Sequence, residues 1–182
     1  PLGDEVTLEI GHITPIREDD EYGGFRVAIL AKYESINTPL KIDITTGDII
    51  TPDAVRYAFR SNFEEKTFEV WAYNVETILA EKVETILRRS ILNTRPRDFY
   101  DAYIIMKTQH QTIYKNIFVS ALGATSKKRM SLNALQDKDK ILLTIKADPI
   151  MRRRWDRYCK ENYYANGIGF DEVIGILLEI IN

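Results

Sequence analysis

The sequence predicts an α+β protein in which a β-rich N-terminal lobe precedes a C-terminal helical bundle. Up to residue 73 apolar and polar residues alternate as in strands, and from Asn74 onward the apolar residues recur every three to four positions, as on a helix face. With 182 residues, 45% of them hydrophobic, the chain can bury a core without disulfides. We expect the first lobe over residues 4–73 and the second over 74–182, and the opening "PLG" looks like the remainder of a cleaved affinity tag.

Strand signals in the first lobe are separated by turn residues. The segments that read as strands are 6–10, 24–35, 40–45 and 66–74. In the third segment the apolar residues point to one side, while Lys41 and Asp43 point to the other. Asp43 is therefore expected on a strand whose back is anchored in a core, which is a rigid platform for a metal-binding acid. A solvent-facing acid fits the same pattern.

Helical periodicity predicts six helices in the second lobe. Asp148 is expected to cap the fifth, with Pro149 in its first turn. The predicted helices are 75–90, 98–108, 111–123, 132–145, 149–163 and 170–181.

Lys82 lies where an apolar residue should be. One turn to either side are Ile78 and Ile86, which share the apolar stripe of the first predicted helix. The aliphatic stem of Lys82 should therefore be covered, and leaving its ammonium desolvated without a partner would cost several kcal/mol. We expect an acid to meet it.

Two acids of the next predicted helix are candidates for this partner. Asp98 and Asp101 share a face of its first turn, and a short link between antiparallel helices would bring them back towards Lys82 or Arg89. Arg89 is seven residues after Lys82 on the same stripe. Helix capping alone also explains the two acids. On the functional reading, Lys82 and Arg89 bind phosphates while Asp43 and Asp98 handle metal and proton.

The run "YNVETILAEKVETILRRSILNTRPRDFYDAY" resembles the third and fourth motifs of the AbiEii/AbiGii toxin family of nucleotidyltransferases. In that family an "AEK" helix, with an arginine seven residues after the lysine, precedes a "(K/R)DxYD" helix. Upstream, "LKIDITTGDIITP" is similar to the family's second motif, a strand with Lys-x-Asp followed by Gly-Asp. The resemblance extends from about Gly24 through the helical tail and implies a nucleotidyltransferase-like β lobe.

The resemblance implies a toxin of a toxin–antitoxin or abortive-infection system that passes a nucleotide from a nucleoside triphosphate, with Mg²⁺, to an acceptor hydroxyl at a tRNA end. It implies Asp43, Lys82 and Asp98 as catalytic residues, with Asp43 as metal ligand. It implies a substrate-binding set of Lys41, Arg89, Arg97 and Asp101. A cognate antitoxin is the implied protein partner, and a cytoplasmic location is expected because neither a membrane span nor a signal peptide can be read from the sequence.

One part of the family pattern is missing from the sequence. The first motif, Gly-Ser followed by Asp-x-Asp on a strand, is not found. Asp137 and Asp139 form an Asp-x-Asp, but lysines are interleaved with them and the pattern predicts a solvated helix terminus. The first motif is therefore expected upstream of residue 4, which leaves open whether this fragment is active.

Two other function classes compete with this reading. Pro52-Asp53 and Glu64-Glu65-Lys66 have the letters of a PD-(D/E)xK metal-dependent nuclease, although Glu65 stands where an apolar residue belongs, and a turn after an exposed helix explains "NFEEKT" better. The other is a non-catalytic module that binds an antitoxin, or RNA through the basic runs 127–129 and 152–154. The balance of 25 basic and 27 acidic residues favours no nucleic-acid partner by itself, and one cysteine and two histidines exclude a disulfide framework and a zinc cluster.

Overall fold

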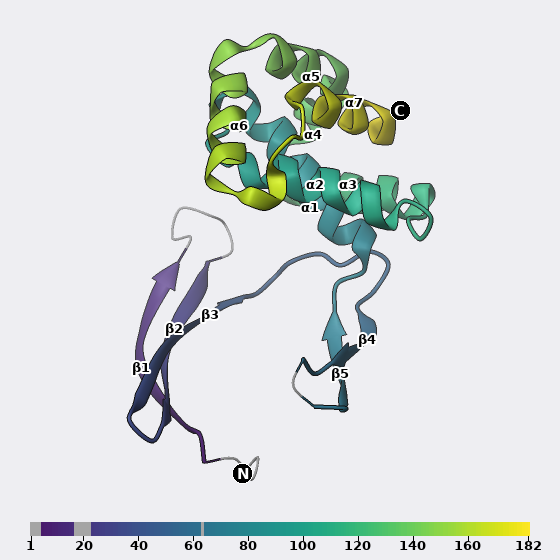
Figure 1. The fold of residues 1–182 in the computed structure, drawn as a ribbon. Coiled ribbons are helices and arrows are strands. Elements are labelled where there is room, and N and C mark those ends of the chain that lie inside the picture. Colours follow the sequence, from purple (N-terminus) through teal and green to yellow (C-terminus); the bar gives the residue numbers. More distant parts are fainter. Residues whose placement is uncertain (1–4, 17–22, 63) are drawn as a thin grey trace. The chain divides into compact units, whose positions relative to one another are not determined.

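The computed structural model describes residues 5–16, 23–62 and 64–182, and strands precede helices as an α+β protein requires (Figure 1). The chain divides into two compact units, Pro1–Asp48 and Ile49–Asn182. The strands are β1 (Thr7–Ile16), β2 (Gly24–Tyr33), β3 (Ile36–Thr45), β4 (Val55–Arg60) and β5 (Thr67–Ala72). The helices are α1 (Val75–Arg89), α2 (Pro96–Gln109), α3 (Lys115–Lys128), α4 (Leu132–Gln136), α5 (Lys138–Ala147), α6 (Pro149–Glu161) and α7 (Phe170–Ile181), with short 3-10 turns η1 (Ser90–Leu92) and η2 (Tyr163–Ala165).

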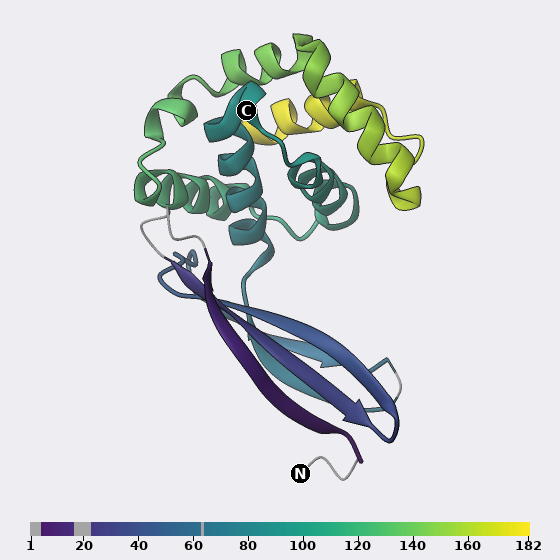
Figure 2. The ribbon, with the colours of Figure 1, turned by 90° about the vertical axis from the view of Figure 1, so that its left-hand side faces the viewer.

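The first unit is an antiparallel meander in the order β1-β2-β3, and Figure 2 shows it as one long twisted sheet. The register places Arg26 opposite Asp43 and Ala28 opposite Lys41. The apolar side of β3 does not have the buried backing that the sequence predicts: Ile42 is 49% exposed, and Leu40 and Ile44 are similarly open. The reason is that this unit has a single layer in its described residues, whereas a buried sheet face requires a second.

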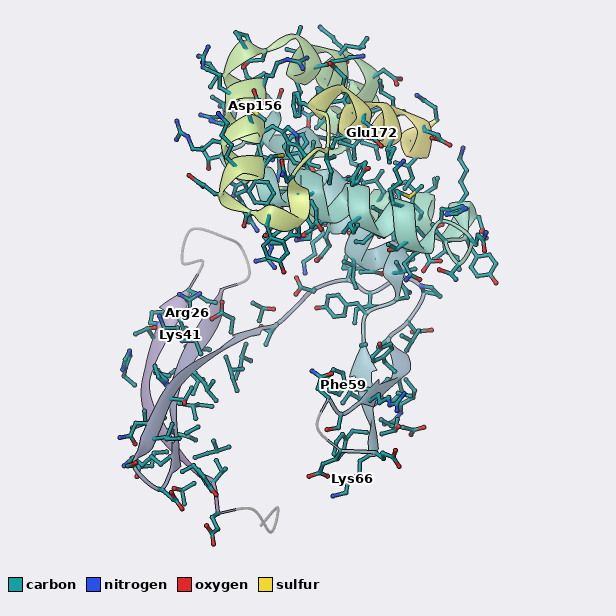
Figure 3. All side chains as sticks on the ribbon, in the orientation of Figure 1. Arg26, Lys41, Phe59, Lys66, Asp156 and Glu172 are labelled. Carbon is teal, nitrogen blue, oxygen red and sulfur yellow. The ribbon has the colours of Figure 1, made fainter. Side chains whose placement is uncertain are left out.

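The second unit begins with a β hairpin that the sequence analysis missed in part. Residues 55–60 form β4, paired antiparallel with β5, where an exposed helix was expected. Arg56 lies opposite Trp71, and its guanidinium is 4.1 Å from the ring centroid. The hairpin carries Phe59 on β4 and Lys66 just before β5 (Figure 3). The Lys66 ammonium is 2.6 Å from the Glu64 carboxylate, so these two residues of the nuclease-like pattern form an ion pair with each other in an exposed turn.

The helices follow the predicted order with two corrections. The third spans Lys115–Lys128 instead of 111–123. Its start is shifted because the carboxylate of Glu76, only 4% exposed, accepts the backbone N–H of Tyr114 at 3.0 Å and fixes the chain there. The predicted helix 132–145 is in fact α4 and α5, which break at Asp137. The carbonyl of Asp137 accepts the N–H of Ile141 and so starts α5.

The hydrophobic core of the described residues lies in the helices of the second unit. Asp148 caps α6, as predicted, by accepting the N–H groups of Ile150 and Met151 at 2.7 and 2.8 Å. Trp155 is 1% exposed, and its indole N–H donates to the Ile168 carbonyl at 2.9 Å. Core side chains also include Leu79, Val83, Ile86, Phe99, Phe118, Leu142, Ile145, Val173, Ile174 and Leu177. No helix in the described part of the chain combines the length and the apolar character needed to span a membrane.

Candidate functional site

Helix α1 is anchored at its start by a side-chain cap. The Asn74 side chain accepts the Thr77 N–H at 2.8 Å and donates its amide to the Thr51 carbonyl at 2.6 Å. The Thr77 hydroxyl, fully buried, accepts the N–H of Thr51 at 3.0 Å. The helix therefore enters the bundle in a fixed direction, and its buried stripe faces α2 and α3.

Lys82 on this stripe meets the acids of α2. Its ammonium lies 3.3 Å from Asp98 Oδ1 and 2.8 Å from Asp101 Oδ2. The Asp98 side chain is 2% exposed, and those of Lys82 and Asp101 are 25% and 23% exposed. The two helices thus bring together the lysine and both acids that the sequence singled out. Burial of this kind makes the pair sensitive to loss of either partner.

Two arginines complete the cluster. Arg95 Nε is 3.1 Å from Asp98 Oδ2, and Arg97 Nε is 3.8 Å from Asp101 Oδ1. The Arg95 contact is an ion pair without hydrogen-bond geometry. Asp98 Oδ2 is therefore buried without a hydrogen-bond partner among the described residues. Three cations therefore surround two carboxylates, and this excess of positive charge suits an anion such as phosphate. Arg95, three residues before Asp98, was missed by the sequence analysis.

Arg89 ends the same helix. Its Nε is buried and has no hydrogen-bond partner in the part of the chain that the structure describes. Its spacing from Lys82 places both side chains on one side of α1, two turns apart. An unsatisfied buried guanidinium nitrogen is costly unless a ligand meets it, which is compatible with the predicted contact to a substrate phosphate.

Asp43 and Lys41 belong to the first unit. Both Asp43 oxygens accept from Arg26, at 2.6 Å from Nε and 2.8 Å from Nη2. This hydrogen-bonded pairing raises the pKa of Arg26, and both side chains are 45% exposed. Arg26 was missed by the sequence analysis, although a cross-strand cation is a common partner of a strand acid. Arg26 and Lys41 both lie on this sheet (Figure 3).

No cluster of three or more His, Cys, Asp or Glu side chains within the described ranges is placed to hold a metal ion. A cation held by one or two carboxylates together with substrate phosphates requires no such cluster. The assignment of Asp43 as a metal ligand stays a prediction.

Three arginines of the two basic runs are engaged within the protein. Arg152 forms an ion pair with Asp171 through two hydrogen bonds of 2.9 and 3.0 Å. Nη1 of Arg154 donates to the carbonyls of Ile91 and Asn93. The guanidinium of Arg129 is 2.7 Å from the carboxylate of buried Glu84 and also meets Glu81. These contacts favour a structural role for the three arginines over a surface for RNA.

Comparison with known proteins gives one family match. A model described as "AbiEii: Nucleotidyl transferase AbiEii toxin, Type IV TA system" matches residues 1–174 of the 182. No curated protein and no solved structure matches the chain.

Proposed function

Because the chain belongs to the AbiEii nucleotidyl transferase toxin family, whose type IV toxin–antitoxin systems imply a nucleotide substrate and an antitoxin partner, we propose that it transfers a nucleotide from a nucleoside triphosphate to an RNA end. The observation that supports this most is the position of Lys82 between Asp98 and Asp101, on the helix pair that carries the "AEK" and "RDFYD" motifs. Mg²⁺ bound to the triphosphate would offset the charge of the phosphates.

Lys82 binds a phosphate oxygen of the nucleotide in this proposal. Its ammonium has three donor positions, and two carboxylates hold it in place without neutralising the whole cluster. A fixed cation stabilises negative charge that develops on a transferring phosphoryl group, at no cost of reorganisation. Arg89, with its unsatisfied Nε, is a second phosphate ligand from the same helix.

Asp98 positions Lys82 and is the essential acid of the site. Its side chain is 2% exposed, and its Oδ2 accepts no hydrogen bond from the described residues although Arg95 Nε is 3.1 Å away. As a carboxylate at the motif position, Asp98 is proposed to handle the proton of the acceptor hydroxyl. Asp101, one turn further along α2, and Arg97, directly before Asp98, bind substrate. The roles of Asp43 as metal ligand and of Lys41 as phosphate ligand are proposed from their match to the family's strand motif.

A tRNA end is the proposed acceptor, and one incubation separates the function classes. The protein is mixed with each radiolabelled nucleoside triphosphate, Mg²⁺ and total tRNA, and the RNA is resolved by gel. A transferase labels and lengthens the RNA, a nuclease shortens it, and a module that only docks an antitoxin leaves it unchanged.

We expect labelled RNA from the wild type and none from Lys82→Ala or Asp98→Asn, with the helical circular dichroism retained. Lys107→Ala is the matched control, because this lysine pairs with Glu172 at 3.0 Å outside the cluster. An unlabelled RNA pool with active controls for RNA integrity would overturn the proposal, as would full labelling by the Lys82 variant.

A further inference from the structure

Tyrosine rings lead from the Lys82 cluster to the protein surface. Tyr100 lies on α2 one turn after Arg97 and directly before Asp101. Its ring centroid is 4.9 Å from that of Tyr164, which in turn is 5.6 Å from that of Tyr163. These three rings join η2 to the end of α2 that carries the ion pairs.

The outermost ring is open to solvent. Tyr163 is 90% exposed and Tyr164 45% exposed. The planes of the two rings are 73° apart, so the rings meet edge to face, and the 90% exposure of Tyr163 leaves most of its ring surface open. A ring so exposed adds little to folding stability, because that contribution scales with the apolar area removed from water.

The neighbouring ring is held in a fixed orientation. The Asn162 amide donates to the Tyr158 carbonyl at 2.8 Å, which turns its oxygen towards the Tyr164 hydroxyl, 2.8 Å away. Since Tyr164 donates its one proton there, the Tyr158 hydroxyl must donate to Tyr164, at 3.2 Å. Burial raises the pKa of Tyr158 strongly, and the hydrogen bond to Tyr164 and the charge of Asp101 raise it further, so this donor stays protonated.

An aromatic pair of which one ring is held in place, beside a cationic cluster, matches the chemistry of a nucleotide. Bases stack on tyrosine faces irrespective of sequence, and basic side chains nearby bind the phosphates to which the bases are joined. Arg97, whose side chain is 78% exposed and whose charge acts on Tyr158, lies on α2 one turn before Tyr100. We propose that Tyr163 and Tyr164 form a stacking surface for a nucleobase next to the Lys82 cluster. This inference rests on the proposed function and deepens it.

The base can come from the nucleoside triphosphate or from the unpaired end of an acceptor RNA, and binding without turnover distinguishes the two. The probes are ATP, CTP, GTP and UTP with Mg²⁺, a short unpaired RNA ending in CCA, and inorganic tripolyphosphate, which has no base. Calorimetry gives the Kd of each for the wild type, Tyr163→Ala, Tyr163→Phe and Lys82→Ala. Tyr114→Ala is the matched control, because this tyrosine is 66% exposed and precedes a different helix.

We expect Tyr163→Ala to weaken binding of a base-bearing probe by roughly 5- to 150-fold, corresponding to a stacking free energy of about 1–3 kcal/mol. Tyr163→Phe should bind within about 2-fold of the wild type, since phenylalanine keeps the π face. Tripolyphosphate binding should be unchanged in both. A loss confined to the triphosphates identifies the donor base, and a loss confined to the RNA identifies the acceptor base.

Three results would overturn the stacking surface. They are equal Kd values for wild type and Tyr163→Ala with every base-bearing probe, an equal loss for tripolyphosphate, and no binding of any base-bearing probe by the wild type. Failure of the proposed function appears separately. It would show as a tripolyphosphate Kd of Lys82→Ala equal to that of the wild type, or as absence of label transfer to RNA. Neither depends on Tyr163.

Discussion

The Lys82 ammonium lies 3.3 Å from Asp98 Oδ1, across the interface of two helices joined by a short link. The carboxylate is 2% exposed, so water cannot replace a lost partner. This pair therefore couples the packing of α1 and α2 to the charge of the candidate site.

A double-mutant cycle with Lys82→Met and Asp98→Asn should measure this coupling. We expect an interaction free energy of about 1–3 kcal/mol from urea unfolding, because each single variant leaves the other group without its partner in a poorly solvated place. The exposed pair Arg152 and Asp171, with side chains 43% and 56% exposed, is the matched control and should give about 0–1 kcal/mol. Equal coupling in both cycles would contradict the importance of burial at Lys82.

Glu84 provides a second, purely structural test. It is 1% exposed and accepts from Arg88, Arg129 and Ser131 at 2.7 to 2.8 Å. Arg129→Ala should lower the free energy of unfolding by about 3 kcal/mol, because a buried carboxylate loses a charged donor. The measurement is the urea midpoint at constant m. Arg153→Ala, on the exposed side of α6, should change the free energy of unfolding by no more than about 0.5 kcal/mol.

Asp43 tests whether the first unit takes part in the reaction. Asp43→Asn should abolish RNA labelling while lowering stability by less than about 1 kcal/mol, because its pair with Arg26 is half exposed. Arg26→Ala is the control, since it removes the same ion pair and keeps the carboxylate. Labelling lost equally in both variants would assign the pair a structural role, and labelling kept by Asp43→Asn would remove Asp43 from the site.

Acid should weaken the contact between α2 and α7 at Glu172. Lys107, whose ammonium is 3.0 Å away, and the Tyr103 hydroxyl at 2.9 Å hold the pKa of Glu172 below its ordinary value of 4.5. A lowered folded-state pKa contributes stability that is present above the unfolded value and is lost as pH falls through the folded one. The stability advantage of wild type over Glu172→Gln should therefore shrink from about pH 6 to about pH 3 in urea titrations. A constant difference across this range would contradict the pairing.

Much of the helical unit could be predicted from the sequence because its signals are local. Periodicity gave α1, α6 and α7 within two residues of their bounds, and Asp148 with Pro149 marked the start of α6. The start of α3 could not be predicted, because the contact that fixes it comes from Glu76 on α1, which is far away in the sequence. For β4, the alternation at residues 55–60 was present in the sequence, but its strand character depends on pairing with β5.

The sequence by itself determined that Lys82 needs an acid, because a cation on an apolar stripe cannot stay buried alone. It also pointed to Asp98 and Asp101, since a short link folds their helix back onto the first. Only the tertiary structure decided that Arg95 shares Asp98, that Arg26 holds Asp43 and that Tyr100 meets the rings of η2. Such pairings depend on how helices and strands cross, and the crossing is set by packing of the whole unit, which no local pattern of residues records.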